Sequence, residues 1–94
     1  MAFRSVYPDV AIPEIALTDY VFARALERGD KPALIDGPSG RVITYAQLPV
    51  LVAGAAAGMA GRGFKKGERF AIYSANVPEY AIAFHAIATL GGAA

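Results

Sequence analysis

The sequence predicts an α/β fold whose sheet is incomplete, and three patterns support this. Residues 69–74 contain a short apolar run with aromatic and β-branched members, which is typical of a strand covered on both faces. A helical pattern without charged residues follows from Tyr80 and ends at Gly91. Two short strand patterns flank a glycine-rich turn earlier in the chain. Because a strand–helix unit normally leads into a second, parallel strand, and none follows here, we expect the chain to be the front part of a larger protein.

Residues 1–17 predict an extended arm. Pro8 and Pro13 each disfavour helical geometry at the residue before them. The apolar residues available to anchor the arm are Val6, Val10, Ile12 and Ile15. We interpret the arm as a strap packed on the body of the protein, and a partner-binding peptide is the alternative.

A helix is expected over residues 18–28. Thr18 is a suitable N-cap, and Asp19 suits the positive end of the helix dipole. Gly29 is the expected stop. The face expected to be buried consists of Val21, Phe22, Ala25 and Leu26.

Residues 32–36 and 42–45 predict two strands joined by a Gly-Pro-Ser-Gly turn at 37–40, which together indicate a β-hairpin. A phosphate-binding loop would require a helix after the turn, and a strand pattern follows instead.

Thr44 and Gln47 predict a capping box that opens the longest helix, which extends to about Arg62. Pro49 conflicts with a helix that starts directly after Thr44, because its ring would clash with the carbonyl of Tyr45. Either the regular helix begins a few residues later or its first turn is distorted. The expected buried face is Leu48, Leu51, Val52, Ala55 and Met59. A second stripe of small residues, explained by close approach of another backbone, is Gly54, Ala57, Gly58 and Gly61.

The glycines around Lys65 and Lys66 match no nucleotide-binding motif. They follow a helix and precede a strand pattern, which indicates a helix C-cap and a turn. We therefore interpret the two lysines as solvated or as favourable charges at the end of the helix, not as phosphate ligands.

Ser74 and Asn76 are the better site candidates, because they follow the C-terminal end of a predicted strand, where α/β folds bind ligands. Asn76 is also explained as an N-cap that pairs with Glu79, with Pro78 in the first helical turn. His85 has no placed serine or carboxylate partner, so we expect a structural histidine with a hydrogen-bonded ring.

Composition excludes several classes of function. The net charge of +1 offers no basic patch for nucleic acid. The absence of cysteine rules out disulfides and thiolate metal sites within the chain and suits a reducing compartment, so we expect a cytoplasmic location. The uncharged stretches 46–61 and 80–94 are too short and too rich in Ala and Gly to span a bilayer, and we interpret them as buried helices.

The order of motifs resembles that of adenylate-forming (AMP-binding) enzymes. The arm at 3–13 is similar to that of 4-coumarate:CoA ligases and their close acyl-CoA synthetase relatives. The segments that resemble the superfamily as a whole are 30–36, 44–48, 63–68, 74–80, 83–85 and 91–92. Pro49 departs from the family pattern, in which a helix-compatible residue is usual at this position.

The resemblance implies that residues 1–17 form an extended arm and that residues 18–94 are an incomplete N-terminal part of an AMP-binding synthetase/ligase domain. It implies a parent enzyme that uses ATP, Mg²⁺ and coenzyme A to convert a small carboxylate into its acyl-CoA by way of an acyl-adenylate. The family's phosphate loop, ribose-binding residues and catalytic lysine lie further along such chains.

We therefore assign no catalytic, cofactor-binding or metal residue within 1–94, and we expect the fragment alone to be inactive. The alternative is a small non-enzymatic interaction module derived from such a domain. A dinucleotide-binding enzyme is disfavoured because no G-x-G-x-x-G follows a strand pattern.

Overall fold

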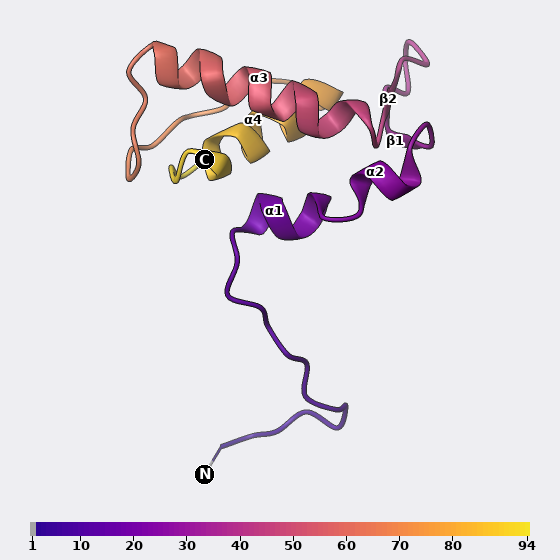
Figure 1. The fold of residues 1–94 in the computed structure, drawn as a ribbon, viewed down its shortest axis with the longest axis vertical. Coiled ribbons are helices and arrows are strands. Elements are labelled where there is room, and N and C mark those ends of the chain that lie inside the picture. Colours follow the sequence, from indigo (N-terminus) through magenta and orange to yellow (C-terminus); the bar gives the residue numbers. More distant parts are fainter. Residues whose placement is uncertain (1) are drawn as a thin grey trace.

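The computed structural model describes residues 2–94 and shows two packed helices, a β-hairpin at one end and an extended N-terminal arm (Figure 1). Met1, the first residue of the expected arm, lies outside the described residues. The elements in chain order are α1 (Leu17–Phe22), α2 (Ala25–Arg28), β1 (Pro32–Ile35), β2 (Val42–Thr44), α3 (Gln47–Gly61) and α4 (Pro78–Thr89).

The arm is extended, as its prolines predict, and it runs away from the helices (Figure 1). The residues expected to anchor it are instead exposed, and Val6 and Ile12 are 94% and 87% accessible. An apolar side chain stabilises a docked arm only by removing its area from water. Residues 17–94 therefore do not provide the surface that the arm would cover.

The single helix expected over 18–28 is wrong, because the chain forms two short helices with a break at Arg24. Thr18 does not cap α1. It is buried, and its hydroxyl bonds to His85 on α4, while Ala16 occupies the N-cap position. The expected apolar face is only partly covered, and Leu26 is 81% exposed. Gly29 ends α2 with a φ of 54°, as expected.

The predicted hairpin is confirmed. β1 and β2 pair antiparallel, with an irregularity in the register between Pro32 and Leu34. The pairing continues at its base, where the Tyr45 amide donates to the Lys31 carbonyl at 3.0 Å. In the turn, Gly40 has a φ of 75°, a conformation that glycine adopts without a steric penalty.

The start of α3 resolves the conflict posed by Pro49. The Thr44 amide donates to Gln47 Oε1 at 3.0 Å, and the Gln47 amide donates to Thr44 Oγ1 at 3.2 Å. These are the two bonds of the predicted capping box. The helix itself begins at Gln47, so Pro49 is its third residue and lies in the first turn, where amides have no intrahelical partner.

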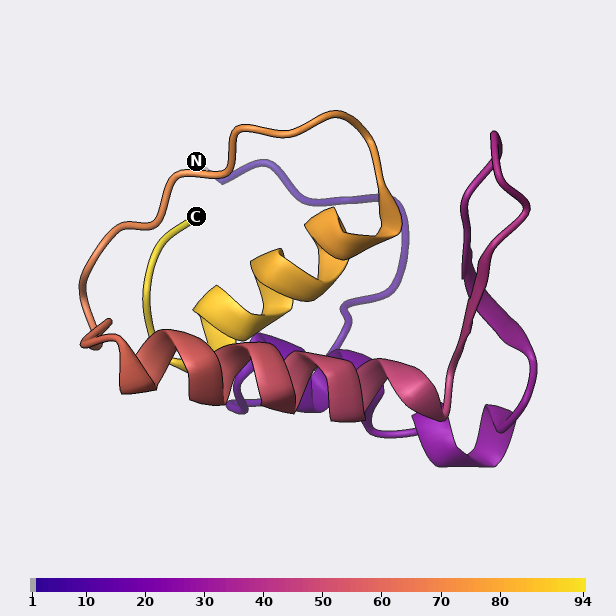
Figure 2. The same cartoon turned by 90° about the horizontal axis from the view of Figure 1, so that it is seen from above.

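The core lies between α3 and α4, which pack against each other (Figure 2). Its main members are Leu48, Val52 and Ala56 from α3 with Ala86 and Ile87 from α4. The expected face of α3 was wrong at Leu51, which is 42% exposed. The expected close approach at Gly54, Gly58 and Gly61 is also absent among the described residues, because a Cβ at each would meet nothing within 4 Å.

The capping pair expected at the start of α4 is wrong by one residue. Val77 is the N-cap and Pro78 is the first helical residue, where proline is favoured. The end of α4 is confirmed at Gly91, which has a φ of 76°. The Gly91 amide donates to Ala88 O and the Gly92 amide to Ile87 O, both at 3.0 Å, which together form a Schellman motif.

The buried strand expected over 69–74 is wrong for the described residues. Within residues 69–74, only Arg69 takes part in pairing, through a single parallel bridge to Ala93. Tyr73 is fully exposed and Phe70 is 36% exposed. A strand needs a neighbour to bind its backbone groups, and residues 2–94 supply one only at Ala93.

Candidate functional site

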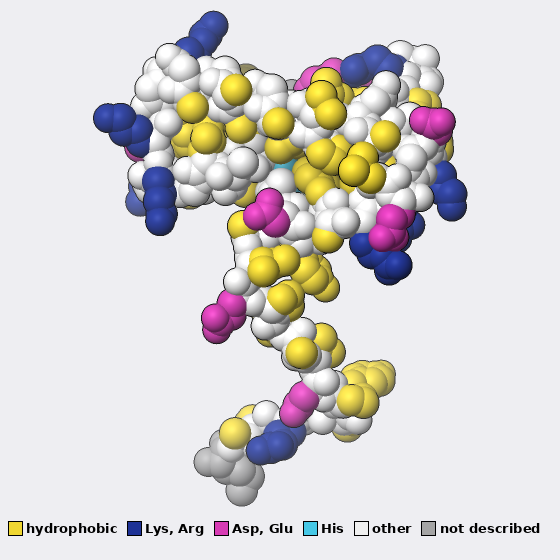
Figure 3. Space-filling model, in the orientation of Figure 1, with side chains coloured by type: hydrophobic (Ala, Val, Ile, Leu, Met, Phe, Trp, Pro, Cys, Tyr) yellow, Lys and Arg dark blue, Asp and Glu magenta, His cyan; other side chains and the backbone are white. Residues whose placement is uncertain are grey.

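A groove lies between the hairpin and the first half of α4. Its volume is about 420 Å³, and its apolar wall includes Leu34, Pro38, Tyr80 and Phe84. Asn76 and His85, which the sequence treated separately, both line this groove. Hydrophobic side chains also gather on the face of the helices and along the arm, with Lys and Arg towards the periphery (Figure 3).

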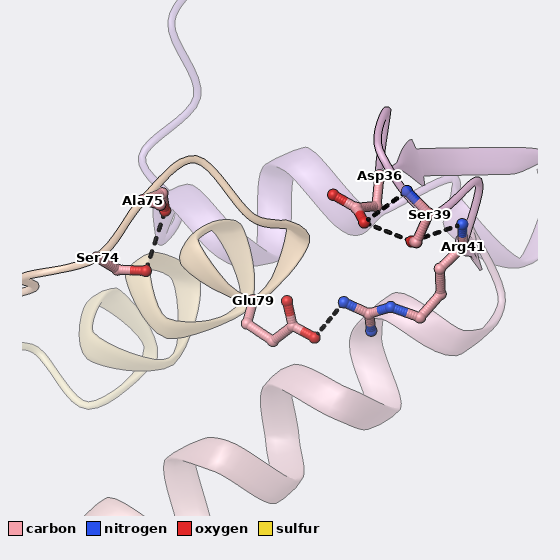
Figure 4. Close-up of polar contacts among 6 residues, drawn as sticks. All are labelled: Asp36, Ser39, Arg41, Ser74, Ala75 and Glu79. Carbon is pink, nitrogen blue, oxygen red and sulfur yellow. Dashed lines mark hydrogen bonds and ion pairs between the residues drawn. The ribbon is translucent and has the colours of Figure 1, made fainter.

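An ion pair fastens the hairpin to α4. Arg41, which follows the turn, reaches Glu79 in the first turn of the helix at 2.5 Å (Figure 4). The pKa of Glu79 is lowered, first by a hydrogen bond from its own backbone and then by Arg41. Sequence reasoning missed this pair, because it assigned Glu79 to helix capping and no local pattern links positions 38 residues apart.

The polar groups of the hairpin turn are used by the turn itself. Ser39 donates to the Asp36 carboxylate from both its amide and its hydroxyl (Figure 4). The Arg41 amide donates to Ser39 Oγ at 3.2 Å. These contacts explain Asp36 and Ser39 as turn-forming residues.

His85 has the hydrogen-bonded ring that the sequence predicts. Its Nδ1 lies 3.0 Å from Thr18 Oγ1, and the Phe22 ring centroid lies 4.8 Å from its own. Burial lowers the pKa of His85 below its ordinary value of 6.5, which favours the neutral form of the ring. Because Thr18 is only 8% exposed, we interpret this contact as an anchor that holds α1 on α4.

Ser74 and Asn76 line a second hollow, which shares Asn76 and Tyr80 with the groove, whereas the two lysines lie elsewhere. Ser74 donates to the adjacent Ala75 carbonyl at 3.0 Å (Figure 4). Lys65 and Lys66 lie in the turn after α3, and the Lys66 side chain packs over Gly91. The turn interpretation of this segment is confirmed, because Gly63 and Gly67 both have positive φ.

Two further features of the described residues concern metal ligands and membrane spans. Within residues 2–94, no three His, Asp or Glu side chains gather closely enough to hold a metal ion. In the same range, no helix combines the length and apolar character needed to cross a bilayer. The groove therefore offers shape and apolar surface, and of its polar residues Asp36 serves the turn and His85 contacts Thr18.

Comparisons with known proteins place these features in a family. Residues 21–94 match the family model for the AMP-binding enzyme. The chain is 40% identical over 94 residues to 4-coumarate–CoA ligase 4 of Arabidopsis thaliana, a match that covers 95% of this chain and 16% of that protein. It is also 40% identical to 4-coumarate–CoA ligase 3 of Oryza sativa subsp. japonica, over 99% of this chain and 17% of that one.

The fold has a solved counterpart. A long-chain-fatty-acid–CoA ligase from Archaeoglobus fulgidus matches 96% of this chain with a TM-score of 0.82 and 22% identity, and the match covers 19% of that chain. The chain thus spans about a sixth of the length of its curated relatives. Because the family model matches well over half of the residues, the chain belongs to the AMP-binding enzyme family.

Proposed function

We propose that this chain is the N-terminal part of an ATP-dependent acyl-CoA synthetase of the 4-coumarate:CoA ligase type. The observation that carries the proposal is 40% identity to such ligases along almost the whole chain. In this proposal, residues 1–17 are an arm and residues 18–94 begin the ligase domain. The similarity includes the arm, which lies outside the match to the wider family at 21–94.

The proposed parent reaction has two steps. A small carboxylate attacks the α-phosphate of ATP and releases pyrophosphate, and the thiol of coenzyme A then displaces AMP from the acyl-adenylate. The parent uses Mg²⁺, for which the described residues form no ligand set, so no step is assigned to them. The cytoplasm suits a cysteine-free chain and a reaction that consumes ATP and coenzyme A.

Within this proposal, residues 1–94 have a structural task. The core between α3 and α4, the hairpin and the Arg41–Glu79 pair shape the start of the domain, and no residue in this part is assigned to catalysis. The 94-residue chain alone is expected to be inactive and to bind none of ATP, Mg²⁺ and coenzyme A.

Pyrophosphate exchange tests the proposal. The full reading frame that contains this chain should catalyse ATP–pyrophosphate exchange with 4-coumarate and form its CoA thioester. The same assay on residues 1–94 alone should give the rate of a no-enzyme control. Absence of exchange by the full protein with 4-coumarate, related aromatic acids and fatty acids would contradict the ligase assignment, whereas exchange by residues 1–94 would contradict their inactivity.

A second candidate is a non-enzymatic interaction module. Exposed apolar side chains favour it, because a self-sufficient domain rarely leaves so much apolar surface uncovered. Those on α3 and α4 include Val50, Leu51, Tyr80 and Phe84. A monomeric 94-residue chain that unfolds cooperatively in urea would support the module, and aggregation or a molten state would support the start of a ligase domain.

A further inference from the structure

We draw no further inference here: the strongest candidate, the apolar groove between the β1–β2 hairpin and the first half of α4, carries none, because nothing in the structure shows what covers it.

Discussion

Replacing Gly92 by alanine should destabilise the junction between the turn after α3 and the end of α4. A Cβ at this position would lie 2.4 Å from Cζ of Phe64 and 3.0 Å from the Glu68 carbonyl oxygen. That carbonyl accepts the bond from the Ala93 amide, so it cannot move away without opening the parallel bridge. The ring is the group that must give way.

The size of the effect follows from what holds that ring. Phe64 packs edge-on against Phe70 with centroids 5.7 Å apart, a contact worth about 0.5–1.5 kcal/mol beyond area burial. Overpacking of a filled site costs about 1–3 kcal/mol. We expect Gly92→Ala to lower the free energy of unfolding by about 2–3 kcal/mol, measured by urea denaturation of the parent protein followed by circular dichroism.

Two further variants make this expectation decisive. Gly37→Ala adds the same methyl group at a position with nothing within 4 Å, so its effect should stay within about 0.5 kcal/mol. Phe64→Leu should recover at least half of the loss in the double variant, because the two side chains compete for one space. The reasoning fails if Gly92→Ala is as neutral as Gly37→Ala, or if the two changes at 64 and 92 are additive.

Three other predictions concern the anchors of α4, each measured by urea unfolding of the parent. Ile87→Ala should cost about 2–5 kcal/mol because Ile87 is fully buried, whereas Ile87→Val should cost about 0.5–1.5 kcal/mol. The stability contributed by His85 should be complete above pH 6.5 and should be lost as the pH falls through its lowered pKa. Thr18→Val should cost about 1 kcal/mol, because it removes the hydrogen bond between Thr18 and His85. Glu79→Gln should cause a small loss that disappears in high salt, because Arg41 and Glu79 are both half exposed.

Distinct results would contradict each of these three. For Ile87, equal losses from the alanine and valine variants would show that the site is not tightly packed. For the histidine anchor, an unfolding free energy that rises as the pH falls from 7 to 5 would reverse the sign derived from its lowered pKa. For the ion pair, the stability contributed by Glu79 should be present above pH 4.5 and lost as the pH falls through its lowered pKa. If the free energy of unfolding of Glu79→Gln falls with acid just as that of the unmodified protein does, Glu79 makes no such contribution.

Local rules predicted the parts of the fold that depend on neighbouring residues. The hairpin, the Thr44–Gln47 capping box and the helix end at Gly91 each depend on residues within a few positions of one another. At the start of α3, Pro49 left two local alternatives, a later start or a distorted first turn, and the structure shows the later start at Gln47.

The features that the sequence analysis missed or predicted wrongly depend on contacts between positions far apart in the chain. Thr18 has the side chain of an N-cap, and its contact with His85 on α4 assigns it to the core instead. Glu79 has the spacing of a capping box, and Arg41 binds it from the hairpin. The strand expected at 69–74 has the right composition, but pairing requires a neighbour that residues 2–94 supply only at Ala93.

The exposed arm changes how the chain scatters X-rays in solution. A compact domain of this length has a radius of gyration of about 12 Å, whereas the structure has 16.0 Å and extends 48 Å along its longest axis. Removing the first sixteen residues should therefore shrink the radius of the isolated chain markedly. In the parent, the same deletion changes the radius little if the arm lies flat on the larger body, so small-angle scattering reports where the arm rests.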